Sequence, residues 1–191
     1  FLLVIFTTGL AHAIMENMEP IISIAHFKMQ FGKTEVIKDL SFEVKRGETF
    51  GFLGSNGSGK TTTIRALLGI YQPTAGELLV GGKPYSVSSG IKLGYLPEER
   101  GLYKKEPVID IMTYFGQLKG MSRLDARQKS LDFLKRVDLL DKAKTRLDKL
   151  SGGQQQKVQL GITVIDNPEL LILDEPTKGF DPVNRRQIGR A

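Results

Sequence analysis

A glycine-rich octapeptide, Gly-Ser-Asn-Gly-Ser-Gly-Lys-Thr, occupies residues 54–61 and matches the pattern G-x-x-x-x-G-K-[ST] at every defined position. Residues 48–53 ahead of it (ETFGFL) are typical of a short buried strand. Residues 61–70 after it (TTTIRALLGI) space their apolar side chains along one helical face. The order of strand, loop and helix predicts a loop that binds phosphate groups at the start of a helix.

The residue types in this loop suit an anion. Gly54, Gly57 and Gly59 lack a Cβ atom, so the backbone can take positive φ values and turn its N–H groups towards a phosphate. Lys60 would reach the β- and γ-phosphates of a nucleotide, and the Thr61 hydroxyl would ligate magnesium. The alternative, a Gly-Ser turn before a chance Lys-Thr pair, gives no reason for so many small residues ahead of a helix. The residues predicted to hold the nucleotide are Gly54, Ser55, Asn56, Gly57, Ser58, Gly59, Lys60, Thr61 and Thr62.

Composition limits the other chemistries open to the chain. Its 191 residues suit one domain, and they include no cysteine and only two histidines, which excludes disulfides, zinc-thiolate sites and a histidine-rich metal site. The net charge of +6 is compatible with nucleic acid or an anionic membrane as a partner. However, the densest basic stretch, residues 142–149, contains Asp148 and no aromatic residue, which favours a solvated helix face. No nucleic-acid partner is expected.

Both ends of the chain are unusual. Residues 1–14 are apolar but fall short of the roughly 20 residues that a membrane helix needs, and they lack a basic start. We interpret residues 1–17 as a non-native leader translated from upstream sequence, with Met15 or Met18 as the natural start. Residues 187–191 stop within a predicted helix, which indicates a truncated gene.

Hydrophobic patterns divide the chain into a β-rich part and a helical part. Short apolar runs at residues 21–27, 40–44 and 77–80 predict an N-terminal layer of strands. The period changes to a helical one over residues 107–149, which predicts a helical insert. Residues 170–173 (LLIL) are fully apolar and predict a central strand of a parallel sheet.

Two carboxylates follow that last strand directly. At the carboxyl end of a strand beside the phosphate loop, Asp174 would hold magnesium and Glu175 would accept a proton from the water that attacks the γ-phosphate. Taken alone, the pair is equally compatible with an acidic turn before Pro176. The phosphate loop earlier in the chain favours the catalytic interpretation.

Residues 150–154 read LSGGQ, in which Ser151 and Gln154 form an S-x-x-Q capping box. A plain helix start is the alternative, but Gly152 and Gly153 cost roughly 1 kcal/mol each relative to alanine inside a helix. Bare amides at a helix N-terminus suit a second phosphate-binding surface. A partner chain would be needed to bring this surface to a nucleotide held by Lys60.

The motifs GSNGSGKT, LSGGQQQK and LLILDEP, in this order, resemble those of the ATP-binding cassette (ABC) ATPases over residues 21–187. The resemblance implies an α/β P-loop NTPase fold over residues 18–191, with a RecA-like core, an antiparallel β-subdomain and a helical subdomain at residues 97–165. It also implies that the last core strands and the switch histidine are missing. In this family two cassettes pair head to tail around ATP and Mg²⁺, so Ser151, Gly152, Gly153 and Gln154 would contact the partner's nucleotide.

Three further residues are assigned through the resemblance. Phe31 lies where the family places an aromatic residue that stacks on adenine, although a core phenylalanine in a strand is the alternative. Glu98 takes the place of the family's glutamine that contacts magnesium and the attacking water. Asp181 matches an aspartate that communicates across the dimer. The segments GYLPEERGLY and GFDPVN are most similar to NatA-type ATPases of ABC-2 exporters.

We therefore expect the ATP-binding and ATP-hydrolysing subunit of an exporter, peripheral on the cytoplasmic face of a membrane, with transmembrane permease subunits and a second cassette as partners. One alternative is a soluble ABC ATPase that acts on DNA or ribosomes. The interval between Lys60 and Ser151 leaves no room for the coiled coil of the chromosome-maintenance type. Another alternative is a fragment that binds ATP without turnover, since the switch histidine is not present.

Overall fold

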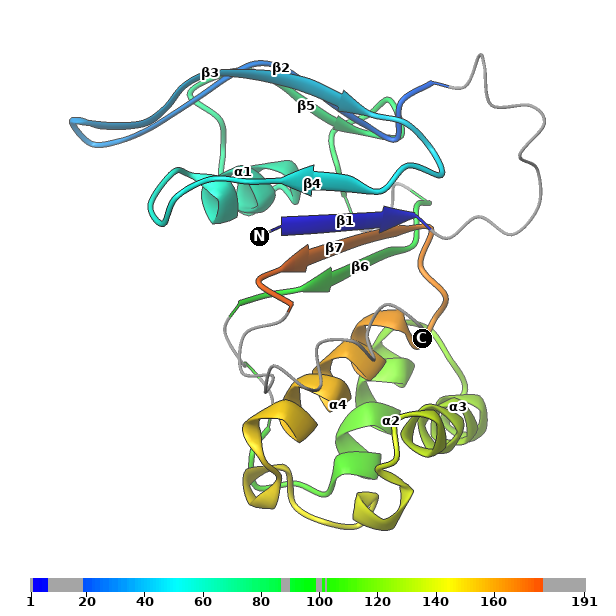
Figure 1. The fold of residues 1–191 in the computed structure, drawn as a ribbon. Coiled ribbons are helices and arrows are strands. Elements are labelled where there is room, and N and C mark those ends of the chain that lie inside the picture. The colour runs from blue at the N-terminus through cyan, green and yellow to red at the C-terminus, as the bar shows by residue number, and fades with distance from the viewer. Residues whose placement is uncertain (1, 7–18, 87–89, 99–100, 102, 177–191) are drawn as a thin grey trace. The chain divides into compact units, whose positions relative to one another are not determined.

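The computed structural model describes residues 2–6, 19–86, 90–98, 101 and 103–176 (Figure 1). These residues fall into two compact units. The first contains the residues up to Leu93 together with residues 169–174, and the second contains residues 94–168 together with those from Glu175 on. Each unit has its own set of buried apolar side chains.

A three-stranded antiparallel sheet forms one layer of the first unit (Figure 1). In it, β2 (Ile22–Phe31) lies between β3 (Thr34–Val44) and β5 (Ala75–Val80). The predicted β-rich N-terminal layer is therefore confirmed, and β2 continues beyond residue 27, where its apolar run ends. The strand continues because the pairing resumes after a local irregularity.

That irregularity lies at Ala25 and His26 in β2. The register with β3 shifts between Ile24 and Phe27, and His26 takes a φ of 50°. Ile24 and Phe27 are nevertheless both buried, because the extra residue restores the alternation of faces. A sequence pattern of strict period two cannot follow such a bulge.

The second sheet has the strand order β4-β1-β7-β6. Its strands are β4 (Phe50–Phe52), β1 (Leu2–Phe6), β7 (Leu170–Asp174) and β6 (Leu93–Leu96). Every residue of β7 is buried, as predicted from its apolar sequence. However, β7 pairs antiparallel with β1, with Leu173 opposite Leu3, so the predicted parallel pairing is wrong at this edge.

The strand β1 comes from the segment that we predicted to be a leader. It pairs antiparallel with both β4 and β7, so these two strands run parallel to each other (Figure 1). The backbone of β1 thereby supplies hydrogen-bonding partners to one edge of β4 and one edge of β7. This double pairing is the physical reason for an antiparallel strand between two parallel ones.

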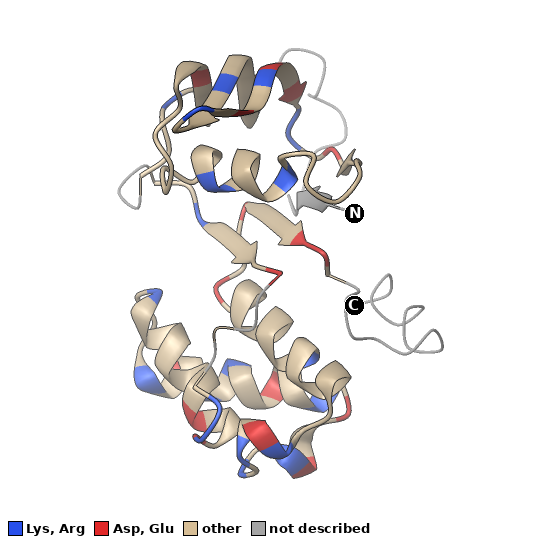
Figure 2. Ribbon diagram, turned by 90° about the vertical axis from the view of Figure 1, so that its left-hand side faces the viewer, with Lys and Arg blue, Asp and Glu red and all other residues tan. Residues whose placement is uncertain are grey.

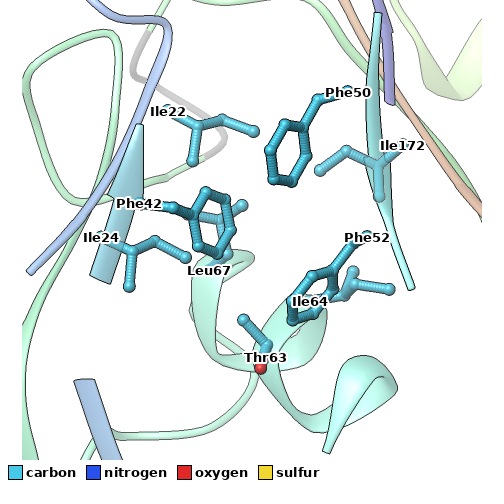
Figure 3. Close-up of a pocket in the computed structure, with 9 residues that line it drawn as sticks. All are labelled: Ile22, Ile24, Phe42, Phe50, Phe52, Thr63, Ile64, Leu67 and Ile172. Carbon is cyan, nitrogen blue, oxygen red and sulfur yellow. The ribbon is translucent and has the colours of Figure 1, made fainter. Parts of the chain in front are cut away.

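Helix α1 (Lys60–Leu67) packs into the first unit through its buried Thr63, Ile64 and Leu67. It ends before the predicted residue 70 because Gly69 takes a φ of 71° and donates its N–H to the carbonyl of Ala66, 3.0 Å away. Figure 3 shows the apolar cavity of about 20 Å³ where α1 meets the strands. It is lined by Ile22, Ile24, Phe42, Phe50, Phe52, Thr63, Ile64, Leu67 and Ile172.

The second unit is helical, as the sequence predicts for residues 107–149. Its helices are α2 (Val108–Leu118), α3 (Arg123–Arg136) and α4 (Gly152–Val164), with short 3-10 turns η2 (Leu140–Lys142) and η3 (Leu147–Lys149). They share one core, in which Val108, Met112, Leu134 and Val158 are completely buried.

Charged residues are interspersed along the helices of the second unit, with Lys and Arg next to Asp and Glu (Figure 2). Around residues 142–149, for example, Arg146 pairs with Asp148, and Lys142 with Asp141 at 2.8 Å. Among the residues that the structure describes, no helix combines the length and the apolar character that crossing a bilayer requires.

Candidate functional site: a nucleotide-binding loop

The octapeptide connects β4 to α1 in the order that the sequence predicts. Gly57 and Gly59 take φ values of 80° and 88°, a left-handed conformation that favours glycine. Gly59 is the N-cap of α1, and no side chain caps the helix. The first amides of the helix therefore remain available to an anion, which the positive end of the helix dipole also favours.

Two glycines of the loop are also required by close packing. A Cβ atom on Gly54 would lie 2.5 Å from the Ser58 Oγ, within the loop itself. A Cβ atom on Gly59 would lie 3.0 Å from the Cγ1 of Ile37 and 3.6 Å from the Cγ1 of Val36. The second contact shows that strand β3 passes directly beside the loop. The β2–β3 hairpin, which carries Phe31, therefore lies next to the phosphate loop.

Lys60, the first residue of α1, is only 8% exposed. Its Nζ donates hydrogen bonds to the carbonyl oxygens of Gly54 and Ser55, both at 2.9 Å. The ammonium group is thus held inside the curve of the loop rather than extended into solvent. A phosphate oxygen within the loop would offer this group a stronger, charge-assisted partner than a neutral carbonyl.

Thr61 and Asp174 meet across the first unit. The Thr61 hydroxyl donates to Oδ2 of Asp174 at 2.9 Å, although 113 positions separate the two residues in sequence. Asp174 is only 2% exposed and is the last residue of β7. The structure therefore brings together two of the three residues that we predicted to hold magnesium, Thr61 and Asp174.

The donor set at Thr61 and Asp174 fits Mg²⁺, which takes oxygen ligands and usually binds through one or two side chains plus substrate phosphates and water. In the described part of the chain, no group of three or more His, Cys, Asp or Glu residues could hold a metal ion.

Glu175, the predicted general base, follows Asp174 and takes a φ of 52°. A positive φ is uncommon for a residue with a Cβ atom, and such conformations concentrate at functional sites. The next residue, Pro176, accepts a hydrogen bond from the Nε2 of Gln156 at 3.4 Å, and Gln156 lies on α4. The turn after β7 is therefore tied to the helix that the LSGGQ segment begins.

The capping box predicted for LSGGQ is confirmed. The Ser151 backbone N–H donates to Oε1 of Gln154 at 2.9 Å, and the Gln154 backbone N–H donates to the Ser151 Oγ at 3.3 Å. Gly152 and Gly153 form the first turn of α4. The side chains of Ser151 and Gln154 therefore stabilise the start of the helix. Their contact with a partner's nucleotide stays a prediction.

Three further residues were predicted to belong to the site: Phe31, Glu98 and Asp181. Phe31 is the last residue of β2 and is 45% exposed, so it is not a core phenylalanine. Glu98 is exposed two residues past β6 and belongs to the second unit, whereas Thr61 and Asp174 belong to the first. Its contact with magnesium stays a prediction. Asp181 lies outside the described residues.

Two residues that support Phe31, Tyr71 and Arg65, were not predicted from the sequence. The ring of Tyr71 contacts that of Phe31 in a T-shaped arrangement, with 5.4 Å between the centroids and 79° between the planes. Arg65 of α1 donates to the Tyr71 hydroxyl at 3.1 Å. Neither residue belongs to a motif, and the only signal in the sequence is an aromatic residue in the turn that follows α1.

The P-loop, the Thr61–Asp174 pair and the LSGGQ helix are together typical of a nucleotide-binding ATPase domain. A model of the ABC transporter family matches residues 37–178, so the chain belongs to that family and is an ABC transporter ATP-binding protein. The first unit carries the phosphate loop and Asp174, and the second carries the LSGGQ helix and Glu175.

Relatives from archaea and bacteria agree with this family. The chain is 44% identical, over 90% of its length, to an uncharacterised ABC transporter ATP-binding protein of Methanocaldococcus jannaschii, of which it covers 62%. It is 34% identical over 85% of its length to the linearmycin resistance ATP-binding protein of Bacillus subtilis, covering 53%. It is 35% identical over 88% of its length to a Nod factor export ATP-binding protein of Cupriavidus pinatubonensis, also covering 53%. The chain thus spans about half to three-fifths of the length of these relatives.

Proposed function

We propose that this chain is the ATP-hydrolysing part of an exporter, in which it drives movement of a substrate through separate transmembrane permease subunits. The observation that carries the proposal is the hydrogen bond between Thr61 and Asp174 beside the buried ammonium of Lys60. This arrangement would supply ligands for magnesium and a cation that binds the phosphates, and phosphoryl transfer needs both.

The chemistry assigns a separate role to each residue. Lys60 stabilises the negative charge that develops on the transferred phosphoryl group. Glu175 orients the attacking water and takes its proton. Thr61 and Asp174 would hold Mg²⁺, with Glu98 as our third candidate ligand, and the ion would neutralise charge on the phosphates. Asp181 would communicate between the two cassettes.

A second copy or a related cassette completes the site in this proposal. Ser151, Gly152, Gly153 and Gln154 of the partner would close on the nucleotide held by Lys60. The support is the glycine turn at the start of α4, which lies at the positive end of the helix dipole, where an anion is favoured. Closing and opening of the dimer would then transmit the energy of ATP to the permease.

The export direction is supported by the relatives. One of them is named for linearmycin resistance and another for Nod factor export. The second name describes outward movement of a compound. A chain of this kind would lie on the cytoplasmic face of the membrane, where ATP is available.

A permease contact is supported by an aromatic surface in the second unit. Tyr103 and Tyr114 are 57% and 44% exposed, and their ring centroids lie 6.0 Å apart. A groove beside them is lined by Tyr103, Glu106, Asp110, Ile111 and Tyr114. Cytoplasmic loops of membrane proteins carry an excess of Lys and Arg, which would suit the carboxylates of this groove.

The proposed hydrolysis is tested with Glu175→Gln. We expect phosphate release from MgATP to fall by at least about 100-fold, because the general base is lost. Calorimetry should show that MgATP binding stays within about 3-fold of wild type. Glu77→Gln, a change at an exposed position on β5, is the control and should leave both quantities unchanged. Equal turnover in wild type and Glu175→Gln would contradict the assigned role.

Two alternatives give different results in the same assays. A chain that binds ATP but releases no phosphate, alone or with a second cassette, would be an ATP-binding fragment. A chain that hydrolyses ATP but does not co-purify with a membrane protein would favour a soluble ABC ATPase.

A further inference from the structure

The exposed ring of Phe31 does not stand alone. It lies at the end of β2, and the Tyr71 ring meets it nearly at right angles, with the centroids 5.4 Å apart. A T-shaped aromatic contact of this kind has a preferred geometry, because the positive edge of one ring meets the negative face of the other. Tyr71 therefore limits the orientations that the Phe31 ring can adopt.

Tyr71 contacts Arg65 through both its side chain and its backbone. Its hydroxyl accepts a hydrogen bond from Nη1 of Arg65 at 3.1 Å, and the guanidinium carbon lies 5.9 Å from the centre of its ring. Its backbone N–H donates to the carbonyl of Arg65 at 3.2 Å. Arg65 belongs to the last turn of α1, the same helix that begins with Lys60.

The turn that carries Tyr71 is also fastened to β2. The Thr74 backbone N–H donates to the carbonyl of Lys28 at 3.0 Å, and its Oγ1 accepts from the backbone N–H of Gln30 at 3.0 Å. Gln30 immediately precedes Phe31. Helix α1, the turn after it and the end of β2 thus form one connected support for the Phe31 ring.

We propose that Tyr71, anchored by Arg65, is a positioning residue that fixes the Phe31 ring for stacking against the adenine of ATP. The inference rests on the proposed function, because it assumes that Phe31 contacts the base. Helix α1 then acts at both ends, with Lys60 at the phosphates and Arg65 behind the aromatic pair. An ordered ring loses less conformational entropy when a base stacks on it than a mobile ring would.

The two parts of the nucleotide allow a direct test. Inorganic tripolyphosphate offers only the phosphates, whereas ATP offers the phosphates and the base. The quantity measured is the affinity for MgATP divided by the affinity for magnesium tripolyphosphate, both by calorimetry. A change in overall stability or in the phosphate loop alters both affinities and leaves this ratio unchanged.

Four variants and one control are compared with wild type. Phe31→Leu should lower the ratio about 5- to 100-fold, the range for loss of a base stacked on an aromatic residue. Tyr71→Leu should lower it about 3- to 10-fold, the range for loss of an aromatic pair. Tyr71→Phe keeps the ring and should lose less. In the double variant Phe31→Leu, Tyr71→Leu, the ratio should equal that of Phe31→Leu alone, because Tyr71 acts only through Phe31. Leu124→Ala, at an exposed leucine of α3, should match wild type.

Each failure has a distinct meaning. A wild-type chain that binds neither ligand would overturn the proposed function and this inference with it. If Phe31→Leu leaves the ratio unchanged, Phe31 does not stack on the base, and the inference fails while phosphate binding stands. If Tyr71→Leu leaves the ratio unchanged, or if its loss adds to that of Phe31→Leu, Tyr71 does not position the ring.

Discussion

At the scale of single residues, the site depends on one contact between distant parts of the chain. Thr61 sits in the first turn of α1, and Asp174 ends β7, so their hydrogen bond fixes the phosphate loop relative to the end of the strand. A hydroxyl and a carboxylate at 2.9 Å are already close enough to share one metal ion after a small separation. This spacing is the reason why we propose the pair as magnesium ligands.

This arrangement predicts a magnesium-specific defect in Thr61→Ala. We expect the affinity for MgATP to fall about 10-fold, the order of magnitude for losing one contact to a charged group. The affinity for ATP in the presence of EDTA should change by less than about 2-fold, because the Lys60 ammonium and the loop amides remain. Calorimetry measures both values. Thr61→Ser is the control that keeps the hydroxyl, and an equal loss with and without magnesium would contradict the assignment.

The sequence predicted these residues because each has a fixed place in a motif. Lys60, Thr61 and Asp174 follow from the pattern of the phosphate loop and the strand that ends in Asp-Glu. Tyr71 and Arg65 could not be predicted, since the contact of Tyr71 with Phe31 and that of Arg65 with Tyr71 arise only when the turn after α1 folds back on β2.

At the scale of elements, α4 is packed closely against its neighbours at Gly161. A Cβ atom there would lie 2.5 Å from two ring carbons of Phe133 and 2.8 Å from the Cε of Met112. Phe133 is only 7% exposed, so its ring has little space into which it could move. A glycine inside a helix is otherwise unfavourable, and here the helix contact requires it.

Gly161→Ala should therefore destabilise the protein despite the better helix propensity of alanine. Overpacking costs about 1–3 kcal/mol, and the propensity gain returns about 1 kcal/mol, so we expect a net loss of up to about 2 kcal/mol. Thermal unfolding should show a melting temperature lower by several degrees, roughly 2–8 °C. Gly101→Ala, where a Cβ atom would meet nothing within 4 Å, is the matched control. A melting temperature at or above that of wild type would show that the α4 contact can relax.

Ser151 and Ser122 both cap helices, so substitutions of these two serines distinguish a capping role from a role at the dimer interface. Ser151 caps α4, and Ser122 caps α3, where its Oγ accepts from the backbone N–H of Asp125 at 3.1 Å. We expect Ser151→Ala and Ser122→Ala each to reduce the free energy of unfolding by about 1 kcal/mol. Only Ser151→Ala should also reduce ATP turnover, because only α4 is proposed to face a partner's nucleotide.

The measurements are urea unfolding and phosphate release at saturating MgATP. Equal effects of the two substitutions on turnover would mean that Ser151 acts through helix stability alone.

Regular elements were predicted from periodicity, and irregular ones were not. The helices of the second unit and the capping box at Ser151 were predicted because apolar spacing and capping residues are local properties of the sequence. The bulge at His26 and the early end of α1 at Gly69 depend on backbone conformations that the apolar pattern does not record.

At the scale of the whole molecule, the sheet that carries the site contains a strand that no motif indicated. Residues 2–6 are an apolar run without alternation, so the sequence did not distinguish a leader from a strand. Their pairing with β4 and β7 is a long-range contact that depends on the other two strands being in place. The parallel sheet that we predicted is therefore interrupted by an antiparallel strand.

The net charge of +6 is also a property of the whole molecule. Many of the charged side chains are paired with opposite charges, as in the largely buried pair of Lys119 and Asp166 at 2.5 Å and, nearer the surface, the pair of Arg46 and Glu169 at 3.7 Å. Surface pairs of this kind add little stability. Along the described helices, Lys and Arg residues are interspersed with Asp and Glu residues (Figure 2).

Titration of the chain with MgATP in a calorimeter tests the central claim, that the loop at residues 54–61 grips the phosphates of ATP through Lys60. We predict saturable binding to the wild-type chain. Lys60→Ala should weaken it by at least about 10-fold, because a charge-assisted contact is lost. Lys83→Ala, at an exposed lysine of the first unit, should bind like wild type. An absence of binding to the wild-type chain, or equal affinity in wild type and Lys60→Ala, would contradict the account.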